Sequence, residues 1–212
     1  MIAPTPLICL DPGHGTPPAI GRQVEPIGPG SHELKTKDGG GAAAEAPVAL
    51  AIALRARTLL LARGYRVAMT RTGPTIHLGD GDGNIARARF CNLRHAALMV
   101  RIHADGSPDR SLHGVSTLVP AWHRGWTDDI YARSVRAGRA MQQAVTSATG
   151  AANRGVVQRS DLTGFNWANV PAVLVESGFM TSPTESRRLK TGAYQQRVAL
   201  GLARGVAAYL GR

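Results

Sequence analysis

The chain has few aromatic side chains and few acidic ones. Phe, Trp and Tyr make up 5% of its 212 residues, and they are not interleaved with basic residues as in nucleic-acid-binding grooves. The 25 Lys and Arg outnumber the 14 Asp and Glu, which gives a formal net charge of +11 at pH 7. This excess predicts a polyanionic neighbour, and the scarcity of aromatics disfavours nucleic acid relative to an anionic membrane surface or an acidic cell-wall polymer.

Cysteine is also scarce, and long apolar runs are absent. Cys9 and Cys91 form no CxxC pair and lack the spacing of a zinc ribbon. Both suit small buried hydrophobic residues, while a disulfide between them is the alternative in an oxidising compartment. No stretch is apolar enough to span a bilayer, and residues 1–6 lack the charged and apolar regions of an export signal.

The remaining sequence alternates apolar strands with helical patterns. Its length and its 43% hydrophobic content suit one compact domain, 1–212, without an internal repeat or linker. Strands are expected at 7–10, 65–70, 98–105, 115–119, 155–158 and 171–176, and helices at 42–63, 84–93, 129–149 and 195–210. This alternation predicts the α/β class, as a three-layer α/β/α sandwich with a mostly parallel twisted sheet.

A long Gly- and Pro-rich segment interrupts this alternation at about 16–44. Its Gly28-Pro29-Gly30 and Gly39-Gly40-Gly41 runs disfavour regular structure, so we expect a loop. A loop of this length inside a compact domain is typical of a lid, a binding loop or a mobile segment.

Two of the predicted strands end on a histidine. The first leads into Asp11-Pro12-Gly13-His14-Gly15, and the strand at 98–105 carries His103 near its end. Ligands of open α/β sheets bind outside the carboxyl ends of the strands, so both imidazoles are expected at one rim. Two histidines at one rim suggest a metal ion.

Two glutamates are expected near the same rim. Glu45 begins the first long helix, and Glu176 ends the strand at 171–176. Two imidazoles and a carboxylate suit Zn²⁺, and three protein ligands leave the fourth position that a catalytic site needs. Glu176 would then act on the water as a general base.

Each of these residues also has a simpler explanation. A histidine at a strand end often bonds a backbone carbonyl, and an acid such as Glu45 at a helix start is favoured by the helix dipole. Glu176 could be a salt-bridge partner. Their joint occurrence at strand and helix ends favours a common site.

Taken together, these segments resemble the zinc-dependent N-acetylmuramoyl-L-alanine amidases of the type-3 amidase family. The segments that carry the resemblance are Asp11-Pro12-Gly13-His14-Gly15, Glu45, Ile102-His103-Ala104-Asp105 and Pro171 to Phe179. The resemblance covers essentially the whole chain. It implies a peptidoglycan hydrolase that cuts the amide between the lactyl group of muramic acid and L-alanine. It also implies one Zn²⁺ held by His14, Glu45 and His103, with Glu176 as catalytic acid/base.

The chain departs from the usual family pattern in two respects. The 16–44 segment is longer than the usual connection and contains two rival acids, Glu25 and Glu33. Glu45 is preferred because it directly precedes the helical pattern. We expect no separate wall-binding domain, so affinity for anionic wall polymers would come from the net charge of the domain itself.

Further residues near the last strand are candidates for substrate contact. The substrate-binding candidates are Arg154, Asp161, Asn166 and Asn169. Trp167 lies among them, and the alternative is that Trp167 covers the core while the asparagines serve turns. The other histidines are expected on the surface or in the core; they are His32, His77, His95, His113 and His123.

Other functions compete with this interpretation. A zinc carboxypeptidase or deacetylase on a similar scaffold would need a carboxylate-binding arginine or a different third ligand. A noncatalytic wall-binding homologue would not need all four site residues, and a basic nucleic-acid-binding domain explains only the charge. We expect a monomer that acts outside the cytoplasm, in the periplasm or cell wall, and a phage-type lysin is the alternative.

Overall fold

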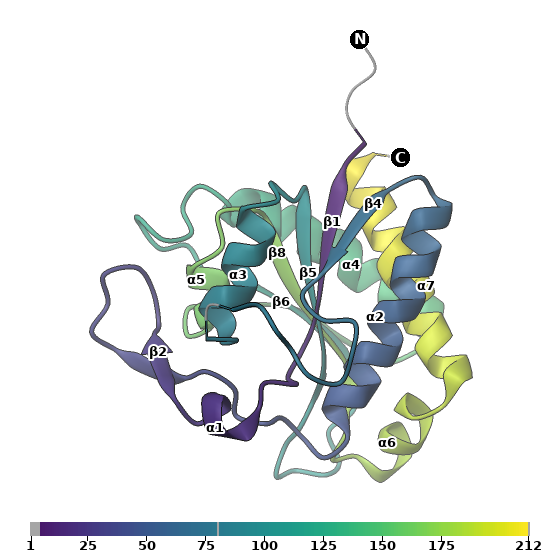
Figure 1. Ribbon diagram of the computed structural model, residues 1–212. Helices are drawn as coiled ribbons and strands as arrows, with labels where there is room; N and C mark the ends of the chain where they lie inside the picture. Colours follow the sequence, from purple (N-terminus) through teal and green to yellow (C-terminus); the bar gives the residue numbers. More distant parts are fainter. Residues whose placement is uncertain (1–4, 80, 212) are drawn as a thin grey trace.

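A six-stranded sheet runs through the centre of the computed structural model, which describes residues 5–79 and 81–211 (Figure 1). The strand order is β4 (Arg66–Met69), β1 (Leu7–Pro12), β5 (Leu98–Asp105), β8 (Ala172–Phe179), β6 (Val115–Pro120) and β7 (Asn153–Arg159). All neighbouring pairs are parallel except β6 and β8, which are antiparallel. The predicted mostly parallel sheet is therefore confirmed. The start of the N-terminal segment, residues 1–4, lies outside the described residues.

Three long helices cover one face of the sheet. They are α2 (Glu45–Ala62), α4 (Tyr131–Thr149) and α7 (Gly192–Leu210). Alternate strand residues such as Ile8, Leu10 and Val100 pack against them in the larger hydrophobic core. Gly201 lets α7 approach α4 closely, because a Cβ there would lie 2.6 Å from Cα of Val145.

The opposite face carries α3 (Asn84–Asn92) and the short α5 (Thr163–Asn166). Met99, Leu174 and Phe165 belong to the smaller core on this side. Cys9 of β1 and Cys91 of α3 form a disulfide there, so the alternative left open by the sequence is the one the structure adopts. The two covered faces confirm the three-layer α/β/α sandwich.

The main elements follow the predicted order, and one further short helix, α6 (Pro183–Leu189), lies between β8 and α7. Along the described ranges, no helix has the length and apolar character needed to cross a bilayer.

The 16–44 segment differs from the expected loop. It contains α1 (Pro18–Gly21) and an antiparallel hairpin of β2 (Val24–Pro26) and β3 (Leu34–Thr36). The carboxylate of Glu25 accepts the backbone N–H groups of Asn84 and Ile85 at 2.8 and 3.2 Å, and thereby caps α3. These long-range contacts order a segment whose local sequence disfavours regular structure.

Indole groups from two other loops hold the same hairpin. Trp126 Nε1 donates to the carbonyl of Pro29 at 2.9 Å, and Trp167 Nε1 donates to that of Pro26 at 3.0 Å. The hairpin is thus docked on the body of the protein.

Candidate metal centre and active site

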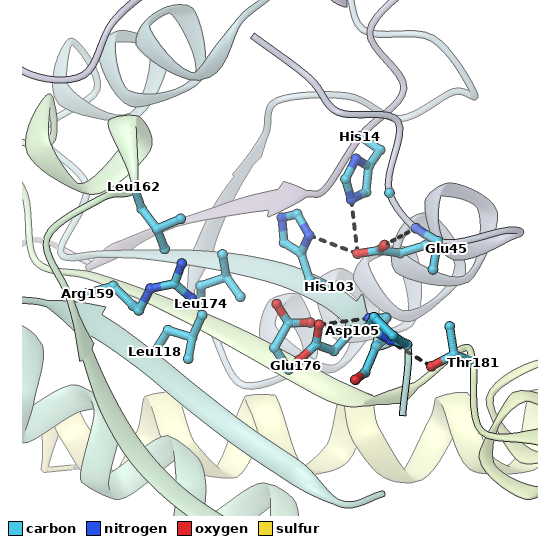
Figure 2. A pocket seen from close by; sticks show the side chains of 15 residues that line it. His14, Glu45, His103, Asp105, Leu118, Arg159, Leu162, Leu174, Glu176 and Thr181 are labelled. Carbon is cyan, nitrogen blue, oxygen red and sulfur yellow. Dashed lines mark hydrogen bonds and ion pairs between the residues drawn. The ribbon is translucent and has the colours of Figure 1, made fainter. Parts of the chain in front are cut away.

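A cavity of about 530 Å³ lies at the carboxyl ends of β1, β5 and β8 (Figure 2). The residues that line it include His14, Glu45, His103, Asp105, Arg159 and Glu176. The four residues that the sequence assigned to one rim therefore share one cavity. This position agrees with the rule for ligand sites in open α/β sheets.

His14 stands on a tight turn immediately after β1. Its φ of +59° lies in the left-handed region, which is unfavourable for a residue with a side chain. Two buried guanidinium groups hold this turn: Arg87 Nη2 donates to the carbonyl of His14 at 2.6 Å, and Arg71 Nη2 donates to that of Gly13 at 2.6 Å. The turn is thereby fixed in the conformation that presents the imidazole.

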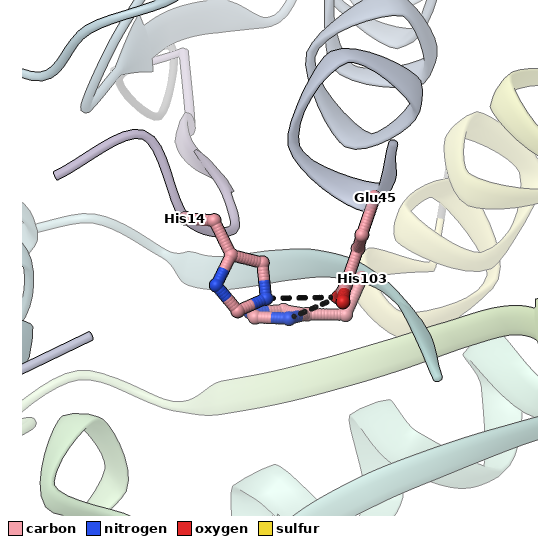
Figure 3. Close-up of side chains that lie close together, drawn as sticks. All are labelled: His14, Glu45 and His103. Carbon is pink, nitrogen blue, oxygen red and sulfur yellow. Dashed lines mark hydrogen bonds and ion pairs between the residues drawn. The ribbon is translucent and has the colours of Figure 1, made fainter. Parts of the chain in front are cut away.

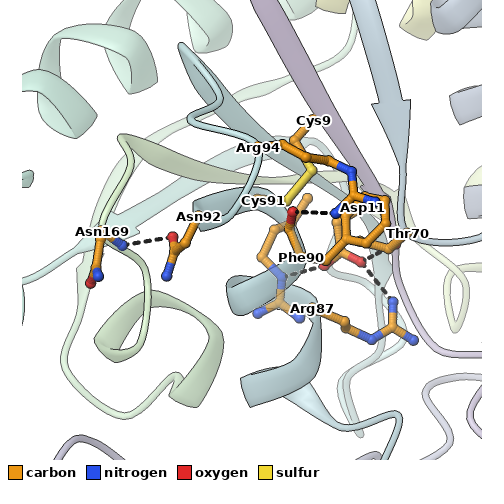
Figure 4. The surroundings of a disulfide bond; sticks show 10 residues. Cys9, Asp11, Thr70, Arg87, Phe90, Cys91, Asn92, Arg94 and Asn169 are labelled. Atoms are coloured by element: carbon orange, nitrogen blue, oxygen red, sulfur yellow. Dashed lines mark hydrogen bonds and ion pairs between the residues drawn. A yellow bond between two sulfur atoms is a disulfide. The ribbon is translucent and has the colours of Figure 1, made fainter. Parts of the chain in front are cut away.

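Arg87 also connects this turn to a buried ion-pair network (Figure 4). Asp11 is fully buried and contacts Arg87 Nη1 at 2.7 Å and Arg101 Nε at 2.8 Å. Burial alone would raise the pKa of Asp11, but the two arginines hold it well below its ordinary range. The network ties the end of β1 to α3 and β5.

Asp38, in the 16–44 segment, orients the imidazole of His14. Its Oδ1 lies 2.7 Å from Nδ1 of His14, and its carboxylate also accepts the N–H groups of Thr16 and Gly40. Burial opposes a charge on His14, but Asp38 and Glu45 raise the pKa of His14 to about 9. The sequence analysis missed Asp38, because nothing in its surroundings signals a fold-back onto His14 across 24 positions.

Glu45 lies between the two histidines at the start of α2. Its Oε1 is 3.0 Å from Nε2 of His14 and 2.9 Å from Nδ1 of His103 (Figure 3). The backbone N–H groups of Ala42 and Ala104 donate to the two carboxylate oxygens at 2.9 and 3.1 Å. Burial opposes ionisation, but the imidazoles lower the pKa of Glu45 below its ordinary range. The carboxylate is therefore held as an anion.

The three side chains form a donor set that fits a zinc ion. One ligand atom from each of His14, Glu45 and His103 lies within 4.8 Å of the others. Two imidazole nitrogens and a carboxylate oxygen are ligands that Zn²⁺ accepts in catalytic sites. The contact of His14 Nδ1 with Asp38 is of the kind that fixes a metal-binding imidazole in one tautomer.

The rival acids of the 16–44 segment have other partners. The carboxylate of Glu25 caps α3, as described above. Glu33 is exposed and pairs with Lys35 at 3.4 Å. Of these acids, Glu45 is the one that the structure brings beside His14 and His103.

Glu176 lies on β8 directly beside His103 of β5. Its carboxyl group is buried, and its Oε2 has no hydrogen-bond partner among the described residues. Burial, with the nearby carboxylates of Asp105 and Glu45, raises the pKa of Glu176 well above its ordinary value. A carboxyl group with a raised pKa can exchange protons near neutral pH, which general acid/base catalysis requires.

Three of the four predicted substrate-binding residues do not line this cavity and make other contacts. Arg154 packs over Phe179 and lines a neighbouring cavity that shares Asp105 with the first. Asn166 is buried and donates to the carbonyls of Ile27 and Ser160. The contact with Ile27 helps to hold the docked hairpin. Asn169 is exposed, and its backbone N–H donates to the side chain of Asn92.

Asp161, the fourth candidate for substrate contact, does not line the cavity itself but binds a residue that does. Its carboxylate binds Nε and Nη2 of Arg159, each at 2.7 Å, and Arg159 lines the cavity. The sequence analysis missed Arg159. Its strand, β7, runs antiparallel to β8, so the rule that brings the carboxyl ends of parallel strands to one rim does not point to it.

Comparisons with known proteins agree with this geometry. A family model described as N-acetylmuramoyl-L-alanine amidase matches residues 8–208. The chain belongs to this type-3 amidase family. Its members are peptidoglycan amide hydrolases, and membership favours this activity over the carboxypeptidase and deacetylase alternatives.

Individual relatives cover nearly the whole chain. The amidase Rv3717 of Mycobacterium tuberculosis is 30% identical over 96% of this chain and 86% of its own length. AmiA of Escherichia coli is 28% identical over 98% of this chain and 84% of its own length. The crystal structure of the amidase Ami1 from Mycobacterium smegmatis matches with a TM-score of 0.86 and 30% identity, covering 97% of each chain. The amidase fold is thus shared along the full length of the sheet and its covering helices.

Proposed function

We propose that His14, Glu45 and His103 hold one zinc ion, and that Glu176 is the general acid/base for hydrolysis of the amide between N-acetylmuramic acid and L-alanine. The observation that carries this proposal is the convergence of both imidazoles on Oε1 of Glu45, in the cavity that Glu176 also lines. When bound, zinc would lower the pKa of a coordinated water and polarise the scissile carbonyl.

Glu176 moves the proton in this mechanism. Its carboxylate takes a proton from the water as the water oxygen attacks the lactyl carbonyl carbon. When the carbon–nitrogen bond breaks, Glu176 gives this proton to the amine of L-alanine. The muramic acid side is released as a carboxylic acid, whose remaining proton passes to the amine or to solvent water. The buried position of Glu176 beside Leu174 gives its carboxyl group the proton affinity that this transfer needs.

The other residues keep the ligands in place. Asp38 holds Nδ1 of His14, so that Nε2 faces Glu45. The N–H groups of Ala42 and Ala104 hold the carboxylate of Glu45. Because these contacts come from rigid elements and a docked hairpin, the donor set needs little rearrangement on binding an ion.

The disulfide and the charge support a location outside the cytoplasm. A bond such as Cys9–Cys91 forms and persists in oxidising compartments. The net charge of +11 would attract the domain to anionic wall polymers. We therefore place the chain in the periplasm or cell wall as a single catalytic domain, 1–212, that acts as a monomer and has no nucleic-acid partner. Action as a phage-type lysin is the alternative.

Purified peptidoglycan tests the proposed function. The protein is incubated with it, with and without a chelator, and the new chain ends are identified by mass spectrometry. New N-terminal L-alanine that appears only when metal is present is the expected result. New reducing sugar ends in place of L-alanine would contradict the proposal.

A further inference from the structure

Arg159 is the only Lys or Arg among the described residues that line the active-site cavity. Three acids, Glu45, Asp105 and Glu176, also line this cavity. In Figure 2, Arg159 lies on one side of Glu176 and Glu45 lies on the other. Arg159 is therefore the basic side chain of this cavity that can attract an anionic group of a substrate.

Asp161 holds the guanidinium group in one orientation. It binds the Nε and Nη2 edge through two 2.7 Å contacts. Within residues 5–79 and 81–211, Nη1 of Arg159 has no hydrogen-bond partner. An arginine has five N–H donors, so the edge that includes Nη1 can still bind a second carboxylate.

The surface around this guanidinium is apolar. Leu118, Leu162 and Leu174 line the same part of the cavity as Arg159 (Figure 2). Apolar walls exclude water and strengthen a charged hydrogen bond beside them. They can also contact the aliphatic part of a substrate residue that carries the carboxylate.

We propose that Arg159 binds a free carboxylate on the stem-peptide residue that follows L-alanine, and that it selects such stems over stems with a carboxamide there. This inference rests on the proposed function. On the glycan side, the lactyl carboxyl group of muramic acid is already consumed in the scissile amide. The anionic group nearest that bond is therefore on the peptide side. A carboxamide presents N–H groups as well as an oxygen, and it carries no charge for the guanidinium to bind.

The test uses two synthetic muramyl peptides that differ only in a carboxylate or a carboxamide at the residue after L-alanine. The wild type is expected to cleave the carboxylate form with a kcat/KM about 10- to 100-fold higher, the range of a hydrogen bond to a charged group. Arg159→Gln should lose this preference, chiefly through a higher KM for the carboxylate form. Arg159→Lys keeps the positive charge but loses the paired N–H donors of the guanidinium, so it should retain part of the preference for the carboxylate substrate.

Arg133→Gln is the matched control. It removes the same charge from an exposed position on α4, away from the cavity, and should leave the preference unchanged. Equal losses on both substrates in Arg159→Gln would overturn the proposal, because Arg159 would then act on the reaction rather than on the carboxylate. Equal cleavage of both substrates by the wild type would also overturn it. Failure of the wild type to cleave either substrate would instead contradict the proposed function.

Discussion

The carboxylate of Asp38 lies 2.7 Å from Nδ1 of His14, so the 16–44 segment supplies the group that orients a candidate metal ligand. Asp38→Ala should weaken zinc affinity by about 10- to 100-fold, the usual effect of removing an outer contact of a metal-binding histidine. Competition with a chromogenic chelator measures this affinity. The hairpin itself should remain docked, because Glu25 and Trp126 still hold it.

Glu33→Gln is the control for Asp38. It removes an exposed carboxylate from the same segment, and this carboxylate pairs with Lys35 on the surface. Its zinc affinity should equal that of the wild type. An unchanged affinity in Asp38→Ala would show that the contact with His14 has no role in binding the ion.

Stability should depend on the ionisation of Asp11. Its folded-state pKa is held below the unfolded value of about 3.9 by Arg87 and Arg101, which offset the opposing effect of burial. Its contribution is therefore fully present above that unfolded value and is lost as the pH falls through the folded value. Asp11→Asn should lower the free energy of unfolding at pH 7 by about 3–5 kcal/mol, because two buried arginines lose their partner.

Urea unfolding of the two proteins at pH 7 and at several lower pH values checks this dependence. The difference between wild type and Asp11→Asn should shrink below about pH 4, by up to about 1.4 kcal/mol per pH unit. Asp129→Asn, at an exposed site, should match the wild type throughout. A difference that stays constant down to pH 3 would show that the charge of Asp11 is not what stabilises the fold.

The disulfide should contribute to stability because it closes a long loop. Cys9 and Cys91 are 82 positions apart, and bonds that close such loops stabilise proteins by about 2–4 kcal/mol. The double variant Cys9→Ala/Cys91→Ala should therefore unfold at a lower temperature in a calorimeter. A reducing agent should lower the melting temperature of the wild type and leave that of the variant unchanged. Equal melting temperatures under oxidising conditions would contradict a stabilising role.

Binding to cell walls should weaken as salt is added, because the net charge of +11 acts through solvent. The Debye length falls from about 10 Å at 0.1 M salt to about 3 Å at 1 M. Co-sedimentation with isolated walls measures the bound fraction, and Glu176→Gln avoids digestion of the walls during the assay. Binding that is the same at both salt concentrations would exclude electrostatic attraction as its source.

The strand-end pattern could predict the central sheet and the meeting of His14 with His103, because parallel strands bring their carboxyl ends to one rim. It also placed Glu45 and Glu176 near that rim. These predictions depend on local periodicity, which the sequence displays directly.

The docked hairpin, Asp38 and Arg159 could not be predicted in this way. Their positions depend on long-range contacts, such as that of Glu25 with the start of α3. The contact of Asn166 with the hairpin could not be predicted for the same reason, because no local pattern reveals the docking of the hairpin. A side chain that supports the fold and one that faces the substrate look alike until the partner segment is placed.

The most direct test of the central claim compares zinc content and turnover in the wild type, Glu176→Gln and His14→Ala. We predict that Glu176→Gln binds one zinc ion per chain and loses about 10²- to 10⁴-fold in kcat on a defined muramyl peptide, as expected for a missing general acid/base. His14→Ala should lose both zinc and turnover. Wild-type kcat in Glu176→Gln, or full turnover by His14→Ala without zinc, would contradict the account.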